Sequence, residues 1–70
     1  MKQITATMAG NVWKVTVQLG DTVEVGQEVA ILESMKMEIP IEAEVEGKVK
    51  AIQKPEGEFV NEGDVLIELE

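Results

Sequence analysis

The chain has 70 residues, a formal net charge of −8, no Cys, no His and two aromatic residues, Trp13 and Phe59. The length predicts one small domain over residues 1–70. The lack of cysteine excludes a disulfide framework and a thiolate metal site. Together with the charge, these values lead us to expect a soluble cytoplasmic monomer that holds no metal. Fourteen acids against six lysines and no arginine disfavour nucleic acid, and two aromatics so far apart in the sequence do not predict a base-stacking platform.

The first half of the chain favours short β-strands. Residues 11–17 place apolar side chains on both faces at intervals, and residues 29–32 form a continuous apolar run. Valine is frequent in the chain, which favours strands over helices. Between these runs lies a segment with Gly20 and Gly26 at its ends and Val23 at its centre. Its glycines predict tight turns, and Val23 is expected to anchor the segment in the core.

Residues 38–46 alternate acidic with apolar side chains. This period-two pattern predicts a half-buried strand with its acids in water. Pro40 lacks the N–H that a central strand needs, so the strand should lie at the edge of a sheet. No segment shows the spacing of an amphipathic helix, and no apolar run is long enough to span a membrane.

The second half repeats the first at a spacing of 37 residues, so residues 4–33 align with residues 41–70. Strands are predicted over residues 47–52 and 65–69, and Gly57–Gly63 is the counterpart of the first turn segment. A repeat of this kind predicts an all-β fold of two small antiparallel sheets, related by a pseudo-twofold axis, in a flattened barrel or sandwich. The identical positions are Ile4/Ile41, Ala6/Ala43, Gly10/Gly47, Val12/Val49, Gly20/Gly57, Val23/Val60, Gly26/Gly63, Leu32/Leu69 and Glu33/Glu70.

Lys36 lies where the two halves join, in the segment Glu33-Ser34-Met35-Lys36-Met37-Glu38. The symmetry predicts that this segment is a hairpin turn, with Lys36 exposed at its tip and the chain ends at the opposite end of the molecule. Large apolar side chains beside a lysine in an exposed turn indicate a surface that another protein reads. Glu33 and Glu38 place acidic side chains on both sides of this group.

The same segment resembles the biotinyl and lipoyl carrier domains. The biotin-accepting branch of that family has Glu-Ala-Met-Lys-Met at a hairpin between two similar halves, and here Ser34 replaces the Ala. The patterns Gly20-Asp21-x-Val23-x-x-Gly26 and Gly47-x-Val49 also match. The resemblance covers residues 4–70, and the chain looks most like the small free-standing attachment proteins that this family has in bacilli. The equal spacing in both halves leaves no room for the protruding "thumb" of some acetyl-CoA carboxylase carriers.

The resemblance implies a carrier of biotin, bound through an amide to Lys36. A biotin protein ligase would attach it, and the domain would present carboxybiotin between a biotin carboxylase and a carboxyltransferase. The chain itself would catalyse nothing and would have no catalytic residue. The resemblance further implies that the ligase reads the residues flanking Lys36, namely Glu33, Ser34, Met35, Met37 and Glu38.

Other functions stay open at this point. A lipoyl carrier has the same fold, although the family's lipoyl domains commonly have an acid where this chain has Met35. Lipoate with a lipoyl ligase, or acceptance of both cofactors, is therefore an alternative. A phosphopantetheine carrier is disfavoured, because its serine opens a helix and Ser34 lies in a chain predicted to be all-β. An unmodified β-module that binds a protein partner is the third alternative, and in it Lys36 would be dispensable.

Overall fold

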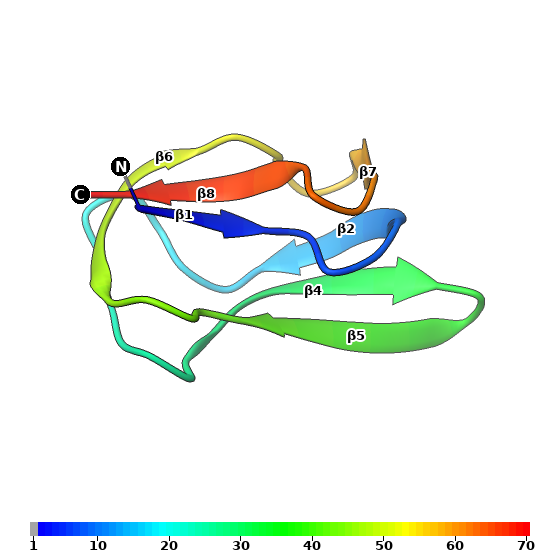
Figure 1. Cartoon of the computed structure of the whole chain (residues 1–70). Coiled ribbons are helices and arrows are strands. Elements are labelled where there is room, and N and C mark those ends of the chain that lie inside the picture. The colour runs from blue at the N-terminus through cyan, green and yellow to red at the C-terminus, as the bar shows by residue number, and fades with distance from the viewer. Residues whose placement is uncertain (1) are drawn as a thin grey trace.

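The computed structural model describes residues 2–70, which form eight strands and no helix, so no helix in this range could cross a membrane. Two antiparallel sheets, ordered β1-β8-β6-β3 and β5-β4-β2-β7, form a flattened half-barrel (Figure 1). The predicted all-β class is confirmed. The strands are β1 (Lys2–Thr5), β2 (Gly10–Val15), β3 (Thr22–Val23), β4 (Glu28–Ser34), β5 (Met37–Glu42), β6 (Gly47–Ile52), β7 (Phe59–Val60) and β8 (Val65–Leu69).

The pseudo-twofold axis relates the two sheets strand by strand, but neither sheet is built from one half of the chain alone. The short strand β3 pairs with β6 of the second half, and β7 pairs with β2 of the first half. The hydrogen bonds repeat as well: the Gly20 N–H donates to the Val49 carbonyl over 3.0 Å, and the Gly57 N–H donates to the Val12 carbonyl over 2.8 Å. The sequence predicted turns here, and the structure adds a strand exchange that locks the two sheets together.

The core lies between the two sheets and consists of aliphatic side chains from both. Val23 and Val60, the central valines of the two turn segments, are 0% exposed, so their predicted role as anchors is confirmed. Burying each apolar side chain of this kind contributes about 1.5–3 kcal/mol to stability. The buried hydrophobic residues of the core are Ile4, Ala6, Val12, Val17, Val23, Val29, Ala30, Leu32, Ile41, Ala43, Val49, Val60, Leu66, Ile67 and Leu69.

A β-bulge explains the irregular alternation of the strand predicted over residues 11–17. Val12 pairs with Leu32 and Lys14 pairs with Ile31, so Trp13 is the extra residue. The bulge shifts the phase of the side chains, and Val15 returns to the core side of the sheet. The second sheet has the same irregularity between Val49 and Ala51 of β6.

Strand β5 is the outermost strand of its sheet, as Pro40 predicted. It ends at Glu42, however, and the predicted strand over residues 38–46 is too long. The chain bends over residues 43–46 because it crosses from one sheet to the other, and Ala43 is buried at the crossing. Alternation continues in the sequence there, but the hydrogen-bonded ladder does not.

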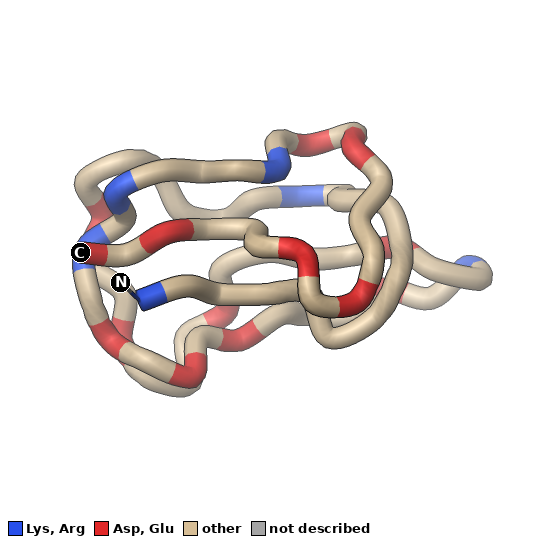
Figure 2. Tube along the Cα trace, turned by 45° about the horizontal axis from the view of Figure 1, so that its top comes forward, with Lys and Arg blue, Asp and Glu red and all other residues tan. Residues whose placement is uncertain are grey.

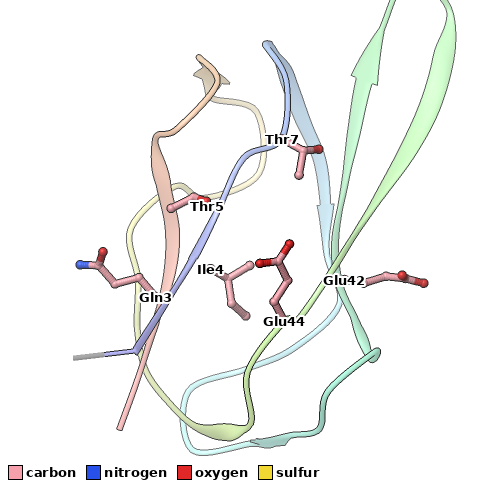
Figure 3. A pocket seen from close by; sticks show the side chains of 6 residues that line it. All are labelled: Gln3, Ile4, Thr5, Thr7, Glu42 and Glu44. Atoms are coloured by element: carbon pink, nitrogen blue, oxygen red, sulfur yellow. The ribbon is translucent and has the colours of Figure 1, made fainter.

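Among the eight described strands, none of one sheet pairs with a strand of the other along the edges of the half-barrel. Between β1 and β5 lies a small, mostly polar pocket in which Glu44 lies close to Ile4, while Gln3 and Glu42 point away (Figure 3). An apolar groove with Val15, Val17 and Ile52 on its walls follows the opposite seam, between β2 and β6. The six residues of the polar pocket are Gln3, Ile4, Thr5, Thr7, Glu42 and Glu44.

The β4–β5 hairpin extends beyond the rest of the molecule, and the chain ends meet at the opposite end (Figure 1). The longest dimension of the protein, 32 Å against 19 and 18 Å, is consistent with this elongated shape. Since Lys2 pairs with Leu69, the first and last strands are neighbours there. The predicted separation of the hairpin tip from the chain ends is confirmed.

Candidate functional site

Lys36 lies in the two-residue turn between β4 and β5. Met35 and Lys36 have φ angles of 52° and 64°, and they are the two non-glycine residues with positive φ in the described range. Ser34 pairs with Met37 at the base of the turn. Two consecutive residues of positive φ between paired strands have the pattern of a type I′ hairpin turn, for which Asn-Gly is the preferred sequence. The turn therefore holds Met35 and Lys36 in a conformation that costs each about 1–2 kcal/mol.

The side chains of the turn point into solvent. Met35 is 90% exposed and Met37 is 62% exposed, and Lys36 is exposed as well. None of the described residues makes a hydrogen bond or an ion pair with the Lys36 side chain. Figure 2 shows the tip as a basic position projecting beyond a body on which acidic positions predominate. The geometry leaves the amine free to meet another molecule from several directions.

The base of the hairpin is packed closely, in contrast to its tip. A Cβ added to Gly10 would lie 2.9 Å from the carbonyl oxygen of Glu33 and 3.3 Å from the Cβ of Ser34. Ser34 itself is half-buried against this contact. The start of β2 therefore supports the end of β4, and a small residue at Ser34 fits the space available. The exposed turn therefore stands on a closely packed base.

Glu33 and Glu38 are directly opposite each other on β4 and β5, one pair of residues below Ser34 and Met37. Both side chains are exposed. Two like charges at opposed positions of a ladder destabilise a sheet. This pair makes the hairpin acidic just below the tip. The six residues of the predicted site, Glu33 to Glu38, thus lie together on one hairpin.

The remaining lysines differ from Lys36 in their positions. Lys2 lies on β1, Lys14 on β2, and Lys48 and Lys50 on β6, while Lys54 is half-buried beyond the end of β6. Within residues 2–70, no group of three or more acidic side chains is placed to hold a metal ion. Lys36 is the lysine that the fold places in a protruding turn.

Trp13 and Phe59 lie closer together in the fold than their positions in the sequence indicate. Phe59 pairs with Asn11 of β2, and Trp13 lies two residues farther along that strand. Far apart in the sequence, they are near neighbours on the outer face of one sheet. Their separation in the sequence does not persist in the fold, because β7 crosses to the sheet of the other half and pairs with β2. The 37-residue repeat contains a sequence signal that these positions are exposed, because each aromatic aligns with a polar residue of the other half. Trp13 aligns with Lys50, and Phe59 aligns with Thr22.

Replacing the turn by its preferred residues, Met35→Asn with Lys36→Gly, is expected to stabilise the protein. Both new residues adopt positive φ readily, so the strain of the turn is relieved. The added glycine loses more conformational entropy on folding, and the net gain in stability is about 1 kcal/mol or more. In a domain of this size the melting temperature should rise by about 4–8 °C. Thermal unfolding followed by circular dichroism measures this. A lower melting temperature would show that the native side chains stabilise the turn by more than its strain costs.

Comparison with known proteins agrees with this geometry. The chain is 67% identical over 66 residues to the biotin/lipoyl attachment protein of Bacillus subtilis (strain 168), and the match covers 94% of this chain and 90% of the relative. It is 50% identical over 62 residues to the biotin carboxyl carrier protein of Streptococcus mutans serotype c, covering 89% of this chain and 48% of the relative.

Solved structures show the same fold within much larger proteins. In the crystal structure of the Kluyveromyces lactis urea carboxylase, a region 33% identical in sequence superimposes with a TM-score of 0.89, covering 99% of this chain and 6% of that one. The family model described as "Biotin-requiring enzyme" matches residues 2–69. The protruding lysine turn, the two symmetric sheets and these similarities lead to one conclusion: the chain belongs to the biotin-requiring enzyme family of biotin and lipoyl attachment domains.

Proposed function

We propose that this chain, as a single domain over residues 1–70, carries biotin bound covalently to the Nζ of Lys36 and presents it to the active sites of a carboxylase system. The observation that carries the proposal is the exposed amine in a strained turn at the far end of the molecule. The names of the similar proteins, an attachment protein and a biotin carboxyl carrier protein, support the same role. A biotin protein ligase, a biotin carboxylase and a carboxyltransferase are the proposed partners.

The residues present fit this cofactor. Attachment requires a lysine amine that can lose its proton and attack an activated carboxyl group, and the exposed Lys36 offers one. The amide bond forms as the activating group leaves, and the net charge changes from −8 to −9. Biotin, once bound, supplies the capacity to accept a carboxyl group and to donate it. No binding pocket is needed at the tip, because the partner enzymes bind the ring of the cofactor.

The fold contributes position and reach. The closely packed base at Gly10 and Ser34 fixes the direction of the hairpin, while the turn keeps Lys36 clear of the body. A cofactor held on such an arm meets successive active sites at a high effective concentration, without free diffusion. The domain does not catalyse a reaction in this proposal. A cytoplasmic location, which the lack of cysteine favours, is part of it.

The intact mass of the protein purified from its native host tests the proposal. A mass increase that corresponds to one biotinyl group is expected. A lipoyl adduct would instead support the alternative cofactor, and an unmodified chain would favour the β-module that only binds a partner. Peptide mapping of the modified protein then identifies the acylated residue, which we expect to be Lys36.

Replacing Met35 by Asp is expected to lower the rate of biotin attachment several-fold while leaving folding intact. The change removes an apolar side chain that is 90% exposed and gives the turn the acid that typifies the lipoyl branch. Aspartate tolerates positive φ, so the turn should form as before. Val25→Asp is the matched control, because it adds the same charge at another exposed turn position. Equal rates for Met35→Asp and the parent would place recognition outside Met35.

A further inference from the structure

The outer face of the sheet β5-β4-β2-β7 carries both aromatic residues of the chain. Phe59 is 59% exposed and Trp13 is 43% exposed, although their neighbours Val60 and Val12 are buried. Phe59 lies opposite Asn11, and Trp13 is the next residue of β2 on the same face. Diagonal neighbours of this kind are within reach of each other when their side chains are large. The two rings therefore form one exposed surface.

Ile31 completes this surface, which we call the aromatic face, and Lys14 flanks it. Ile31 of β4 is half-buried and pairs with Lys14 of β2. The Nζ of Lys14 lies 5.1 Å from the centre of the Trp13 ring, close enough for a cation–π contact. The aromatic face, defined by Trp13, Phe59 and Ile31, is thus continuous across three neighbouring strands.

The internal repeat shows that folding does not require these apolar residues. At the equivalent positions of the other sheet stand Lys50 for Trp13, Thr22 for Phe59 and Glu68 for Ile31. The backbone is the same there, with the bulge and the register repeated. A polar surface is therefore compatible with this architecture. The aromatic face is present on one sheet alone, and that sheet carries the Lys36 hairpin.

The aromatic face continues directly into the hairpin. Phe59, Asn11, Glu33 and Glu38 are successive partners across the sheet, and the last two lie just below the turn. A protein that acts on the unmodified Lys36 must bring its active site to within the length of a lysine side chain from the turn, and it must therefore contact the surface beside the turn. The enzymes that use the attached cofactor can stay farther away, because the cofactor lengthens the arm. The acids give the face a negative border, which selects a partner with a basic border.

We propose that the aromatic face is the docking surface for the ligase that acylates Lys36, and that the ligase meets it with an apolar patch bordered by lysine or arginine. The inference rests on the proposed biotin attachment and adds the surface that selects the protein substrate. Trp13 and Phe59 serve as anchors in this contact, because large aromatic side chains commonly dominate the binding energy of interfaces. Glu33 and Glu38 supply the complementary charge.

The test exchanges each anchor for the residue that the repeat places at the equivalent position, in the double variant Trp13→Lys with Phe59→Thr. A purified biotin protein ligase with biotin and ATP modifies the parent and the variants, and initial rates give kcat/KM for the protein substrate. We expect kcat/KM to fall by about tenfold to a hundredfold, mainly through KM. The matched control, Lys50→Trp with Thr22→Phe, builds the same residues on the other sheet and should retain the parent value.

The outcomes separate the two proposals. If the parent accepts no biotin, the proposed function fails. If the parent is modified and the folded double variant has the same kcat/KM, the docking surface is wrong. The single variants Trp13→Lys and Phe59→Thr, each checked by thermal unfolding, decide the case if the double variant does not fold. Rates that do not fall with added salt would overturn the charged border. Sedimentation of the parent as a dimer, with the double variant monomeric, would assign the face to a second copy and overturn the inference.

Discussion

Biotin attachment is expected to disappear when Lys36 is replaced by Arg. The guanidinium group stays protonated at all relevant pH values, so it cannot attack an activated carboxyl group. The charge and approximate length of the side chain are retained, and the side chain of Lys36 makes no hydrogen bond or ion pair within residues 2–70. The melting temperature should therefore be unchanged. Co-expression with a biotin ligase, followed by a streptavidin blot, measures the loss.

Lys48→Arg is the matched control for this experiment. Lys48 is also exposed, but it lies on β6 of the other sheet, away from both the turn and the aromatic face. We expect this variant to be labelled to the same extent as the parent. A strong signal that persists in Lys36→Arg would move the attachment site to another lysine and refute the proposed role of the hairpin.

Gly26→Val and Gly63→Val are expected to destabilise the protein by similar amounts. The two glycines have φ angles of 87° and 90°, and a Cβ at either would meet no atom within 4 Å. The Cβ itself meets no obstacle, so the expected cost is the backbone strain of a β-branched residue at positive φ, on the order of 1–3 kcal/mol for each variant. The total stability of a 70-residue domain is roughly 4–10 kcal/mol. Each variant should thus lose a substantial share of it, with a drop in melting temperature of about 4–8 °C per kcal/mol.

The two variants also test whether these turns contribute to recognition. The Gly26 N–H donates to the Ala43 carbonyl, and the Gly63 N–H donates to the Ala6 carbonyl, so the local structures match. The segment between β7 and β8, which contains Gly63, is nearer the tip of the β4–β5 hairpin, and the segment between β3 and β4, which contains Gly26, is at the other end (Figure 1). Below their melting temperatures both variants should accept biotin at the parent rate. A defect confined to Gly63→Val would show that its turn contacts the ligase.

Much of the fold could be predicted because its local signals are strong. Strands β6 and β8 agree with the predicted residues 47–52 and 65–69, and Pro40 identified an edge strand. The two-residue strands β3 and β7 could not be predicted. They exist through hydrogen bonds such as that from Gly20 to Val49, which join segments distant in the sequence. Strand β1 was also not predicted, since the strand with which it pairs in residues 2–70, β8, is the last of the chain.

The candidate site was predicted better than its surroundings. The repeat alone places Lys36 in an exposed turn, because the symmetry fixes where the two halves join. The neighbourhood of the turn depends on which strands lie beside β4, and this depends on the exchange of β7 between the sheets. Trp13 and Phe59 were missed for that reason. The bulge at Trp13 added to the difficulty, since it interrupts the alternation that would assign a side chain to a face.

The pseudo-twofold axis also implies that a second turn, equivalent to the one between β4 and β5, could link β8 to β1 and close the backbone into a ring. Two full copies of the 37-residue unit exceed the 70-residue chain by four residues, and the absent positions correspond to Ser34, Met35, Lys36 and Met37. Lys2 and Leu69 are already paired where that link would lie. Joining the two ends through Ser-Met-Lys-Met would close the backbone into a circle with a second lysine turn. Such a cyclic protein would be a bivalent carrier, with one acylation site at each end of its long axis.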